Sequence, residues 1–337
     1  MKISIFMCCY NHAPYLERSI GSILKQTYQN WELVCVDDKS CDNSLEILDN
    51  FALNDSRIKI IKKEQNSGMA APNCNIALEH LGGEFLLGVG PDDEITPNCL
   101  EQFLFQYNEL KNKEIIVDAM ILPTLFSFSQ DQNKNFIHAG IKGKDFSKCE
   151  NKILSGLEAF ELSIDWRISG FAFFRTSLVK KFGFFEEGMN GDEFSCREFF
   201  LNSKKVGFLK ECSYIYHQLD TSITKKLSVK LFDTYKTLYK VEELAKKHNL
   251  NSKIIRKINK IRYREYYYLY VKYLSCKDQF ISLENKTIIE YFNESSKLLK
   301  PYKLLRDYII RKEYDTRGKA LVFFNILKFY FKRIKSV

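Results

Sequence analysis

Four short apolar runs in the first hundred residues each end in a cluster of polar residues, and helical patterns separate them. Each run has the length and composition of a buried strand: Ile3–Cys9, Trp31–Val36, Ile58–Ile61 and Phe85–Val89. Strands that alternate with helices predict a mostly parallel α/β sheet with right-handed crossovers. The carboxyl ends of parallel strands lie on one edge of the sheet, where ligands bind. We therefore expect the four polar clusters to converge on one acidic pocket.

The polar clusters themselves are rich in carboxylates, amides and small residues. They are Tyr10-Asn11-His12, Asp37-Asp38-Lys39-Ser40, Asn66-Ser67-Gly68 and Gly90-Pro91-Asp92-Asp93. Carboxylates in this number repel one another unless they bind a cation or hydrogen-bond a ligand. The Asp92-Asp93 pair offers hard oxygen ligands for Mg²⁺ or Mn²⁺, although Pro-Asp-Asp is also ordinary turn chemistry.

Two familiar nucleotide-binding motifs are missing from the chain. Neither G-x-G-x-x-G after the first run nor G-x-x-x-x-G-K-[ST] occurs, which argues against a Rossmann dehydrogenase and a P-loop enzyme. The remaining way to hold a diphosphate beside carboxylates is a bridging divalent metal ion.

The rest of the chain divides into an acidic front and a basic tail. Beyond residue 123 we expect strands to complete the sheet, and a helix over 192–202. Residues 225–337 carry 28 Lys and Arg against 11 Asp and Glu, whereas residues 1–224 carry 23 against 31. Helical spacing recurs from Leu227 onward, and Ala320–Lys335 has the pattern of a basic amphipathic helix that lies on a membrane. The alternative is a helix packed on its own domain.

Two features bear on the compartment. The ten cysteines lack metal-ligand spacing and mostly lie in apolar runs, which predicts buried free thiols in a reducing compartment. No apolar stretch reaches the length that spans a bilayer, and the chain begins directly with a strand rather than a signal peptide. A cytoplasmic protein is expected.

Taken together, these segments resemble the family 2 glycosyltransferases, which are inverting enzymes with the GT-A fold that use a nucleotide-diphosphate sugar. The resemblance is close over residues 1 to about 100 and looser to about 224. The matching segments are Ile3-Ser4-Ile5 with Tyr10-Asn11, Tyr15-Leu16, Ser22-Ile23-Leu24-Lys25-Gln26-Thr27-Tyr28, Val36-Asp37-Asp38 with Ser40 and Asp42, Asn66-Ser67-Gly68 with Ala70-Ala71 and Asn73, and Gly83-Glu84-Phe85 leading to Asp92-Asp93.

The resemblance implies a role for each matching position. Asp92 and Asp93 match the D-x-D element, one touching ribose and the other the metal ion, Mn²⁺ or Mg²⁺. A carboxylate near uracil N3–H favours UDP as the leaving group. The residues that the resemblance assigns to the nucleotide are Cys9, Tyr10, Asn11, Asp37, Asp38, Asn66, Gly68, Asn73 and Asp92.

The second half of the match supplies the remaining roles. Inversion needs a carboxylate that takes the proton of the acceptor hydroxyl, and Asp192 matches the base position, with Glu193 as the fallback; the alternative for both is an acidic helix start. His217 is a candidate contact to phosphate or metal. The candidate sugar and acceptor contacts are Trp166, Arg167 and Gly170, although a core tryptophan is an equal alternative.

This chain departs from the family pattern at four positions. Gly90 stands at the first acidic position of D-x-D, and Lys39 replaces the glycine after the first Asp pair. Pro72 stands where an arginine usually precedes Asn73, and Gly191 replaces the acid next to the base.

The expected architecture is a GT-A catalytic domain over 1–224 and a basic helical region over 225–337. The expected function is metal-dependent inverting transfer from a nucleotide sugar, with a UDP-sugar favoured, to a glycan or lipid-linked acceptor in bacterial surface polysaccharide or lipooligosaccharide synthesis. The basic helices are candidates for inner-membrane docking or homo-oligomerisation; nucleic acid is not an expected partner. The rival hypotheses are a sugar-1-phosphate nucleotidyltransferase and a non-catalytic protein that binds membrane or nucleic acid through the basic tail.

Overall fold

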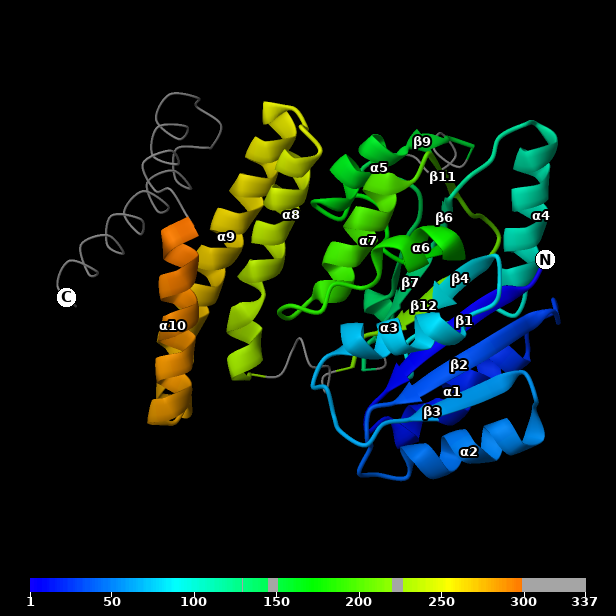
Figure 1. The fold of residues 1–337 in the computed structure, drawn as a ribbon, viewed down its shortest axis with the longest axis horizontal. Coiled ribbons are helices and arrows are strands. Elements are labelled where there is room, and N and C mark those ends of the chain that lie inside the picture. The colour runs from blue at the N-terminus through cyan, green and yellow to red at the C-terminus, as the bar shows by residue number, and fades with distance from the viewer. Residues whose placement is uncertain (129, 145–150, 220–226, 299–337) are drawn as a thin grey trace. The chain divides into compact units, whose positions relative to one another are not determined.

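The computed structural model describes residues 1–128, 130–144, 151–219 and 227–298 (Figure 1). The chain divides into two compact units, Met1–Arg262 and Tyr263–Val337. Each unit is described by itself below. The boundary expected near residue 224 therefore stays a prediction, and the amphipathic segment Ala320–Lys335 lies outside the described residues.

An eight-stranded sheet forms the centre of the first unit, in the order β3-β2-β1-β4-β10-β6-β11-β9. Its first four strands run parallel, as expected. They are β1 (Ile3–Cys9), β2 (Trp31–Asp37), β3 (Ile58–Lys62) and β4 (Phe85–Gly88), connected by α1 (Ala13–Leu24), α2 (Ser44–Asn54) and α3 (Ala70–His80). The strand order reverses between β1 and β4, and ligands bind at such a reversal in α/β sheets.

Both faces of this sheet are buried, which explains why the strands are continuous apolar runs. Ile5 and Met7 of β1 face one hydrophobic core, and Phe6 between them faces the other. Helix α4 (Cys99–Asn112) contributes to the first core. On the other side lie α3, α5 (Gly156–Ser163), α6 (Thr176–Phe182) and α7 (Gly191–Asn202).

The second half of the large sheet contains antiparallel strands. β10 (Ala172–Arg175) runs antiparallel between β4 and β6 (Ala119–Ile121), and β11 (Lys205–Phe208) and β9 (Leu154–Ser155) complete the order. The apolar run Ile115–Leu122 predicts a strand of that length, but β6 covers only Ala119–Ile121. The reason is the end of α4, where Glu114 has a left-handed backbone and Ile115 N–H donates to the Leu110 carbonyl, a helix-ending arrangement that keeps these residues out of the sheet.

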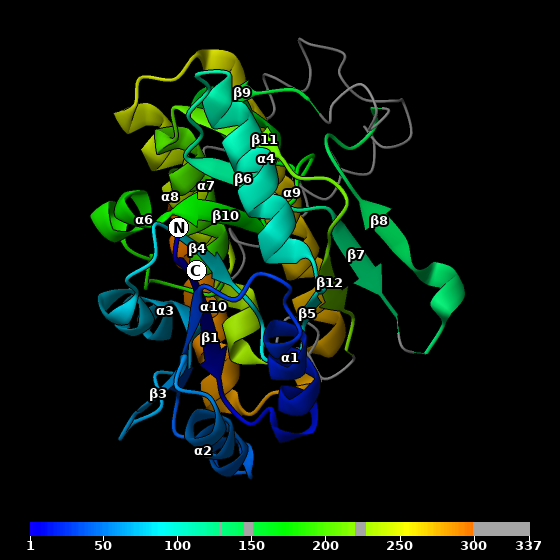
Figure 2. The same ribbon diagram turned by 90° about the vertical axis from the view of Figure 1, so that its right-hand side faces the viewer.

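Of the strands expected beyond residue 123, β10 and β11 complete the large sheet as predicted, whereas the others form a second, four-stranded sheet. It consists of β5 (Glu94–Ile95), β12 (Tyr214–His217), β7 (Thr124–Ser127) and β8 (Phe136–His138), in that order (Figure 2). Pro123 stands between β6 and β7, and a proline cannot donate to a strand ladder. Its carbonyl accepts from Tyr214 N–H instead, at the point where the chain passes from one sheet to the other.

The region after residue 227 is helical, as expected. It begins with a short helix at Val229–Asp233 and continues through α8 (Tyr235–Lys247) and α9 (Ser252–Cys276). Within the first unit, Val241 and Ile258 pack with Phe160 and Phe194, which belong to α5 and α7. Helices α5 and α7, which cover the large sheet, therefore share one core with α8 and the start of α9.

The second unit holds the rest of α9, a short helix at Lys277–Gln279 and α10 (Ser282–Leu298). The rings of Tyr266, Tyr270 and Tyr273 surround Phe292, so tyrosines at helical spacing here form a core. Over the described part of the chain, no helix has the length and apolarity to cross a membrane. All nine cysteines among the described residues are free thiols.

Candidate active site

The loops after β1 and β2 are joined by hydrogen bonds at the carboxyl edge of the sheet. Asp38 N–H donates to the Cys9 carbonyl at 2.8 Å, and Cys41 N–H donates to Asn11 Oδ1 at 2.7 Å. Lys39 has φ 62°, a left-handed conformation that favours glycine. This backbone explains why a glycine is usual at position 39. Tyr10 lies beside the joined loops with 41% of its surface exposed.

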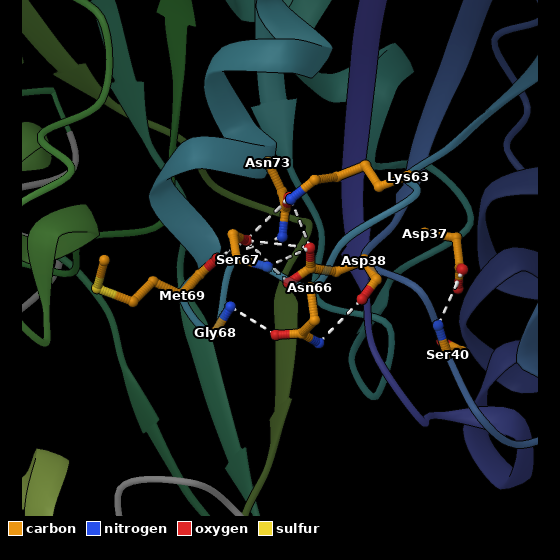
Figure 3. Close-up of polar contacts among 9 residues, drawn as sticks. All are labelled: Asp37, Asp38, Ser40, Lys63, Asn66, Ser67, Gly68, Met69 and Asn73. Atoms are coloured by element: carbon orange, nitrogen blue, oxygen red, sulfur yellow. Dashed lines mark hydrogen bonds and ion pairs between the residues drawn. The ribbon is translucent and has the colours of Figure 1, made fainter.

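Asp38 belongs to a closed polar network that also contains Lys63, Ser67 and Asn73 (Figure 3). Its carboxylate accepts from Lys63 Nζ at 2.5 Å and from Ser67 N–H at 2.9 Å, and its side chain is almost buried. Burial raises the pKa of Asp38, but the hydrogen bonds from Lys63 and Ser67 outweigh it and leave the pKa lowered. Asp38 is thus held in its ionised form, and the charge of Lys63 balances it. The sequence analysis did not identify Lys63.

Asn66 and Gly68 lie on the outer side of the same network. Asn66 donates to the Asp38 carbonyl, and its Oδ1 accepts from Gly68 N–H at 2.6 Å. Gly68 has φ 70°, which a residue with a side chain rarely adopts. The loop after β3 is therefore bound to the loop after β2.

Asp37 differs from its neighbour because one of its oxygens has no donor. Oδ2 accepts from Ser40 N–H at 3.0 Å, whereas the buried Oδ1 has no hydrogen-bond partner among the described residues. A buried unpaired acceptor is unfavourable. Asp37 Oδ1 is consequently an acceptor that a ligand N–H can fill.

Burial, and then the charge of Asp92, raise the pKa of the Asp93 carboxyl to about 7. Asp93 is 3% exposed, and it accepts from the Tyr214 hydroxyl at 2.7 Å and from His217 N–H at 3.0 Å. Both donors come from β12. A carboxylate that is buried beside a second carboxylate is stabilised by a cation.

Gly90 leaves the space that the two carboxylates occupy. A Cβ at this position would lie 2.6 Å from Asp93 Oδ2 and 3.1 Å from Asp92 Oδ1. The glycine that departs from the D-x-D pattern is thus matched to the conformation of the two acids that follow it.

Glu94 joins His217 and Arg18 beside the acidic pair; the sequence analysis named His217 but missed Glu94 and Arg18. His217 Nε2 lies 2.8 Å from Glu94 Oε1, and Arg18 Nε lies 3.3 Å from the same oxygen. Arg18 also donates to the Asp92 carbonyl. The imidazole of His217 is therefore oriented by a carboxylate; its role as a phosphate or metal contact stays a prediction. Only the position of Glu94 directly after Asp93 was visible in the sequence.

Asp192 and Glu193 begin α7, where their environments differ. Glu193 Oε2 pairs with Arg197 at 3.2 Å, whereas among the described residues no cation forms an ion pair with Asp192. Asp192 keeps access to solvent, yet the protein around it desolvates the carboxylate and raises its pKa. Gly191 is required in front of it, since a Cβ there would lie 2.0 Å from the Phe185 carbonyl oxygen.

Trp166 and Gly170 lie against the same helix. The guanidinium of Arg197 stacks on the Trp166 ring at 4.1 Å, and a Cβ on Gly170 would lie 3.0 Å from that ring. Arg197 is 1% exposed, and its Nε has no hydrogen-bond partner among the described residues. Arg167 lies apart from this stack: it lines a small cavity with Lys144 and Lys152.

The charges of the separate clusters meet at Tyr216. Burial raises the pKa of this phenol most, and the negative charges of Asp93, Asp92 and Asp192 raise it further. The end of β4 and the start of α7 are therefore both near this tyrosine. The sequence analysis predicted one acidic pocket; in the structure Asp38 pairs with Lys63, whereas Asp93 and Asp192 form no ion pair among the described residues.

The donor set around Asp92 and Asp93 fits a hard divalent cation. Among the described residues no three His, Cys, Asp or Glu side chains are grouped to hold a metal ion by themselves. Mg²⁺ is commonly bound through one or two carboxylates together with substrate phosphates. The pKa of Asp93 is raised because its ionised form is buried and lies near the charge of Asp92. A bound cation would stabilise that ionised form.

The amino-acid sequence matches a known protein family and several of its members. The glycosyl transferase family 2 model matches residues 4–182. Glycosyltransferase GlyG of Streptococcus pneumoniae is 30% identical over 230 residues, which cover 66% of this chain and 73% of that protein. The UDP-Glc:alpha-D-GlcNAc-diphosphoundecaprenol beta-1,3-glucosyltransferase WfgD of Escherichia coli is 34% identical over 140 residues, 38% of this chain and 54% of WfgD.

A solved structure shares the fold. S. aureus TarS 1-349 in complex with UDP-GlcNAc superposes with a TM-score of 0.61 at 20% identity, covering 90% of this chain and 82% of that one. The chain thus spans most of GlyG and TarS 1-349, and about half of WfgD.

Proposed function

This chain belongs to glycosyl transferase family 2 and has a GT-A fold with a helical C-terminal region, and we propose that it transfers a sugar from a UDP-sugar to a hydroxyl of a glycan or lipid-linked acceptor with inversion. Family membership makes it a transferase and sets the nucleotidyltransferase and non-enzymatic hypotheses aside. One observation carries the proposal. The acidic pair and the helix that carries Asp192 both lie next to strand β12. His217 N–H of β12 donates to Asp93 at 3.0 Å, and the ring of Tyr216, the residue before it, packs on Phe171 at 5.4 Å. Gly170, the residue before Phe171, accepts at its carbonyl from Cys196 Sγ of α7.

The donor pocket that we propose lies over the joined loops after β1, β2 and β3. The unpaired Asp37 Oδ1 is suited to accept the N3–H of uracil, with Tyr10 exposed beside it. Asp38, Asn66, Gly68 and Asn73 act as the scaffold of this pocket, since their polar groups bond to one another. The printed name of WfgD, a UDP-glucose enzyme, and the UDP-GlcNAc in the TarS structure support a UDP-sugar.

Asp93, assisted by Asp92, would hold a divalent cation, Mg²⁺ or Mn²⁺. When bound, the cation neutralises negative charge on the diphosphate of the leaving nucleotide. Tyr214 and His217 N–H keep Asp93 in place through their hydrogen bonds. Both leave lone pairs on the carboxylate oxygens, because each oxygen carries two.

Asp192 is the proposed general base. Its carboxylate takes the proton of the acceptor hydroxyl while that oxygen forms a bond to the anomeric carbon, and the bond from this carbon to the diphosphate oxygen breaks to release UDP. The raised pKa of Asp192 makes it a stronger base than an ordinary aspartate. Glu193 is less suited because Arg197 pairs with it.

The biological setting that we propose is the synthesis of a bacterial surface polysaccharide or lipooligosaccharide. The diphosphoundecaprenol acceptor in the name of WfgD supports it. A cytoplasmic location, docking at the inner membrane face and homo-oligomerisation stay predictions.

The test is release of UDP from a panel of UDP-sugars, with and without Mg²⁺ or Mn²⁺. Asp192→Asn should lower kcat by about 10²–10⁴-fold while UDP still raises the thermal midpoint. The matched control is Glu193→Gln on the same helical turn, which should keep most of the activity. Release at the wild-type rate by Asp192→Asn would remove Asp192 from the base role.

A further inference from the structure

We infer that three aromatic side chains on the small sheet, Tyr216, Phe126 and Phe136, form the subsite that binds the carbohydrate of the acceptor. We call these residues the aromatic row. The inference rests on the proposed transferase function, and it adds what the acceptor presents to the enzyme.

The aromatic row runs straight across three neighbouring strands. Tyr216 of β12 is the register partner of Phe126 in β7, and Phe126 is the partner of Phe136 in β8. Directly paired residues project from the same face of a sheet. The ring centroids are 5.5 Å apart between Tyr216 and Phe126 and 4.6 Å apart between Phe126 and Phe136. The row is therefore continuous.

The inner end of the row lies at the proposed reaction site. Tyr216 directly precedes His217, whose N–H donates to Asp93 at 3.0 Å. The ring of Tyr216 also packs at 5.4 Å on Phe171, and the residue before Phe171, Gly170, accepts at its carbonyl from Cys196 Sγ of α7. The row therefore ends beside the acidic pair and near the helix that carries Asp192. An acceptor hydroxyl at Asp192 would place the rest of its glycan along the row.

The outer end of the row is open to solvent. Phe136 is 50% exposed and Ile137, on the opposite face of β8, is 62% exposed. β8 is the edge strand of the sheet, and Figure 2 shows the β7–β8 hairpin at one side of the first unit. The ring of Phe136 is therefore accessible to a ligand at the edge of the sheet.

The residues around the row favour a carbohydrate over a membrane surface. Residues 124–138 contain one Asp and one Lys, and these two, Asp131 and Lys134, pair with each other at 3.3 Å. A membrane-binding hairpin would need an excess of basic residues. The other polar groups of the hairpin are uncharged amides and hydroxyls: Ser127, Gln130, Gln132, Asn133 and Asn135. Rings that pack on the C–H face of a pyranose, flanked by groups that bond its hydroxyls, match both sides of a sugar.

The experiment measures binding of the full chain, with UDP and Mg²⁺ present, to an array of immobilised bacterial oligosaccharides and polysaccharides. The wild type should bind at least one glycan. Phe136→Leu and Phe126→Leu keep apolar volume but remove a ring, and each should weaken that binding at least tenfold. Phe136→Tyr restores a ring and should bind as the wild type does. Ile137→Ala, which alters the opposite face, is the matched control and should change little.

A second readout separates this subsite from the donor pocket. In this assay the acceptor is a glycan that the wild type binds on the array. Phe136→Leu should raise the KM for this glycan at least tenfold and leave the KM for the UDP-sugar unchanged. The thermal shift with UDP should also be the same in every variant. If UDP does not raise the thermal midpoint of the wild type, that result contradicts the proposed function and not the acceptor subsite.

Three outcomes would overturn the inference. They are unchanged glycan binding by Phe136→Leu, failure of the wild type to bind any arrayed glycan, and loss of binding that is equal in Ile137→Ala. Co-sedimentation with phosphatidylglycerol vesicles, or dimerisation in light scattering that Phe136→Leu abolishes, would identify a lipid surface or a second copy as the occupant.

Discussion

The hydroxyl of Tyr214 donates a 2.7 Å hydrogen bond to the carboxylate of Asp93, and both side chains are almost fully buried. The same hydroxyl accepts from Gly90 N–H at 2.9 Å. Strand β12 thereby holds the conformation of the Gly90–Asp93 loop, although it lies more than a hundred residues further along the chain. The proposed metal site thus depends on packing of the small sheet against the large one.

Tyr214→Phe should destabilise the protein by roughly 1–3 kcal/mol, because the Asp93 carboxylate and Gly90 N–H each lose a buried partner. It should also raise the Mg²⁺ concentration needed for a UDP-induced thermal shift. Urea unfolding and a metal titration measure the two effects. Tyr216→Phe, which removes a hydroxyl that does not touch Asp93, is the control; equal losses in the two variants would argue against the Tyr214–Asp93 bond.

Asp93→Asn should stabilise the metal-free protein at pH 8. The pKa of Asp93 is raised from 3.8 to about 7, so ionisation of the unfolded chain lowers stability as the pH rises from about 4 to 7, and the full cost is present above pH 7. Well below pH 4 the carboxyl is neutral in both the folded and the unfolded state. After subtraction of one lost hydrogen bond, the gain should be roughly 1–3 kcal/mol, and it should disappear as the pH falls from about 7 to 4.

Urea unfolding in EDTA at pH 4 and pH 8 tests this prediction. Asp49→Asn, at an exposed carboxylate that pairs with Lys62, should show no such dependence. A loss of stability of equal size at both pH values would contradict the assignment. Mg²⁺ with UDP should stabilise the wild type but not Asp93→Asn.

Lys63→Met should destabilise the protein by about 3 kcal/mol or more, because it leaves the buried Asp38 carboxylate without its cation. The loss should shrink at acid pH: the pKa of Asp38 is lowered, so the stabilisation is present above its unfolded value and disappears as pH falls through the folded one. Lys62→Met, at the neighbouring residue with an exposed partner, should change stability by about 0–1 kcal/mol. Denaturant curves at pH 7 and pH 3 compare them; a match between the two variants would contradict the network.

Gly90→Ala should lower activity at least tenfold while the protein stays folded. The added Cβ would lie 2.6 Å from Asp93 Oδ2, so the two carboxylates must move. Gly90→Asp, which restores the usual D-x-D acid, should be at least as inactive. Gly21→Ala in α1, where a Cβ meets nothing within 4 Å, is the control and should be stabilising by roughly 0.5–1 kcal/mol. UDP release and circular dichroism give the readouts, and full activity in Gly90→Asp would show that the loop has room.

The four parallel strands, the helices between them and the helical region after residue 227 were predictable from the sequence, because continuous apolar runs and helical spacing are local signals. The motif-bearing loops and the family were predictable for the same reason: Asp37-Asp38, Asp92-Asp93 and Asp192 each lie at a strand or helix end that the local pattern marks. Side-chain partners carry no such signal. Lys63 has the same local context as Lys62, and nothing near Glu94 indicates that His217 lies against it.

The sequence by itself therefore determined which segments form strands and helices along the chain, and which ends of the strands carry the polar residues, since both follow from local periodicity. Only the tertiary structure decided which carboxylates are neutralised. Asp38 meets Lys63 across adjacent loops, and Asp93 meets Tyr214 from a second sheet. The pairing of Glu193 with Arg197, four residues apart on α7, is the local exception. The same long-range pairing aligned Tyr216, Phe126 and Phe136, because register between strands distant in sequence depends on how the whole chain packs.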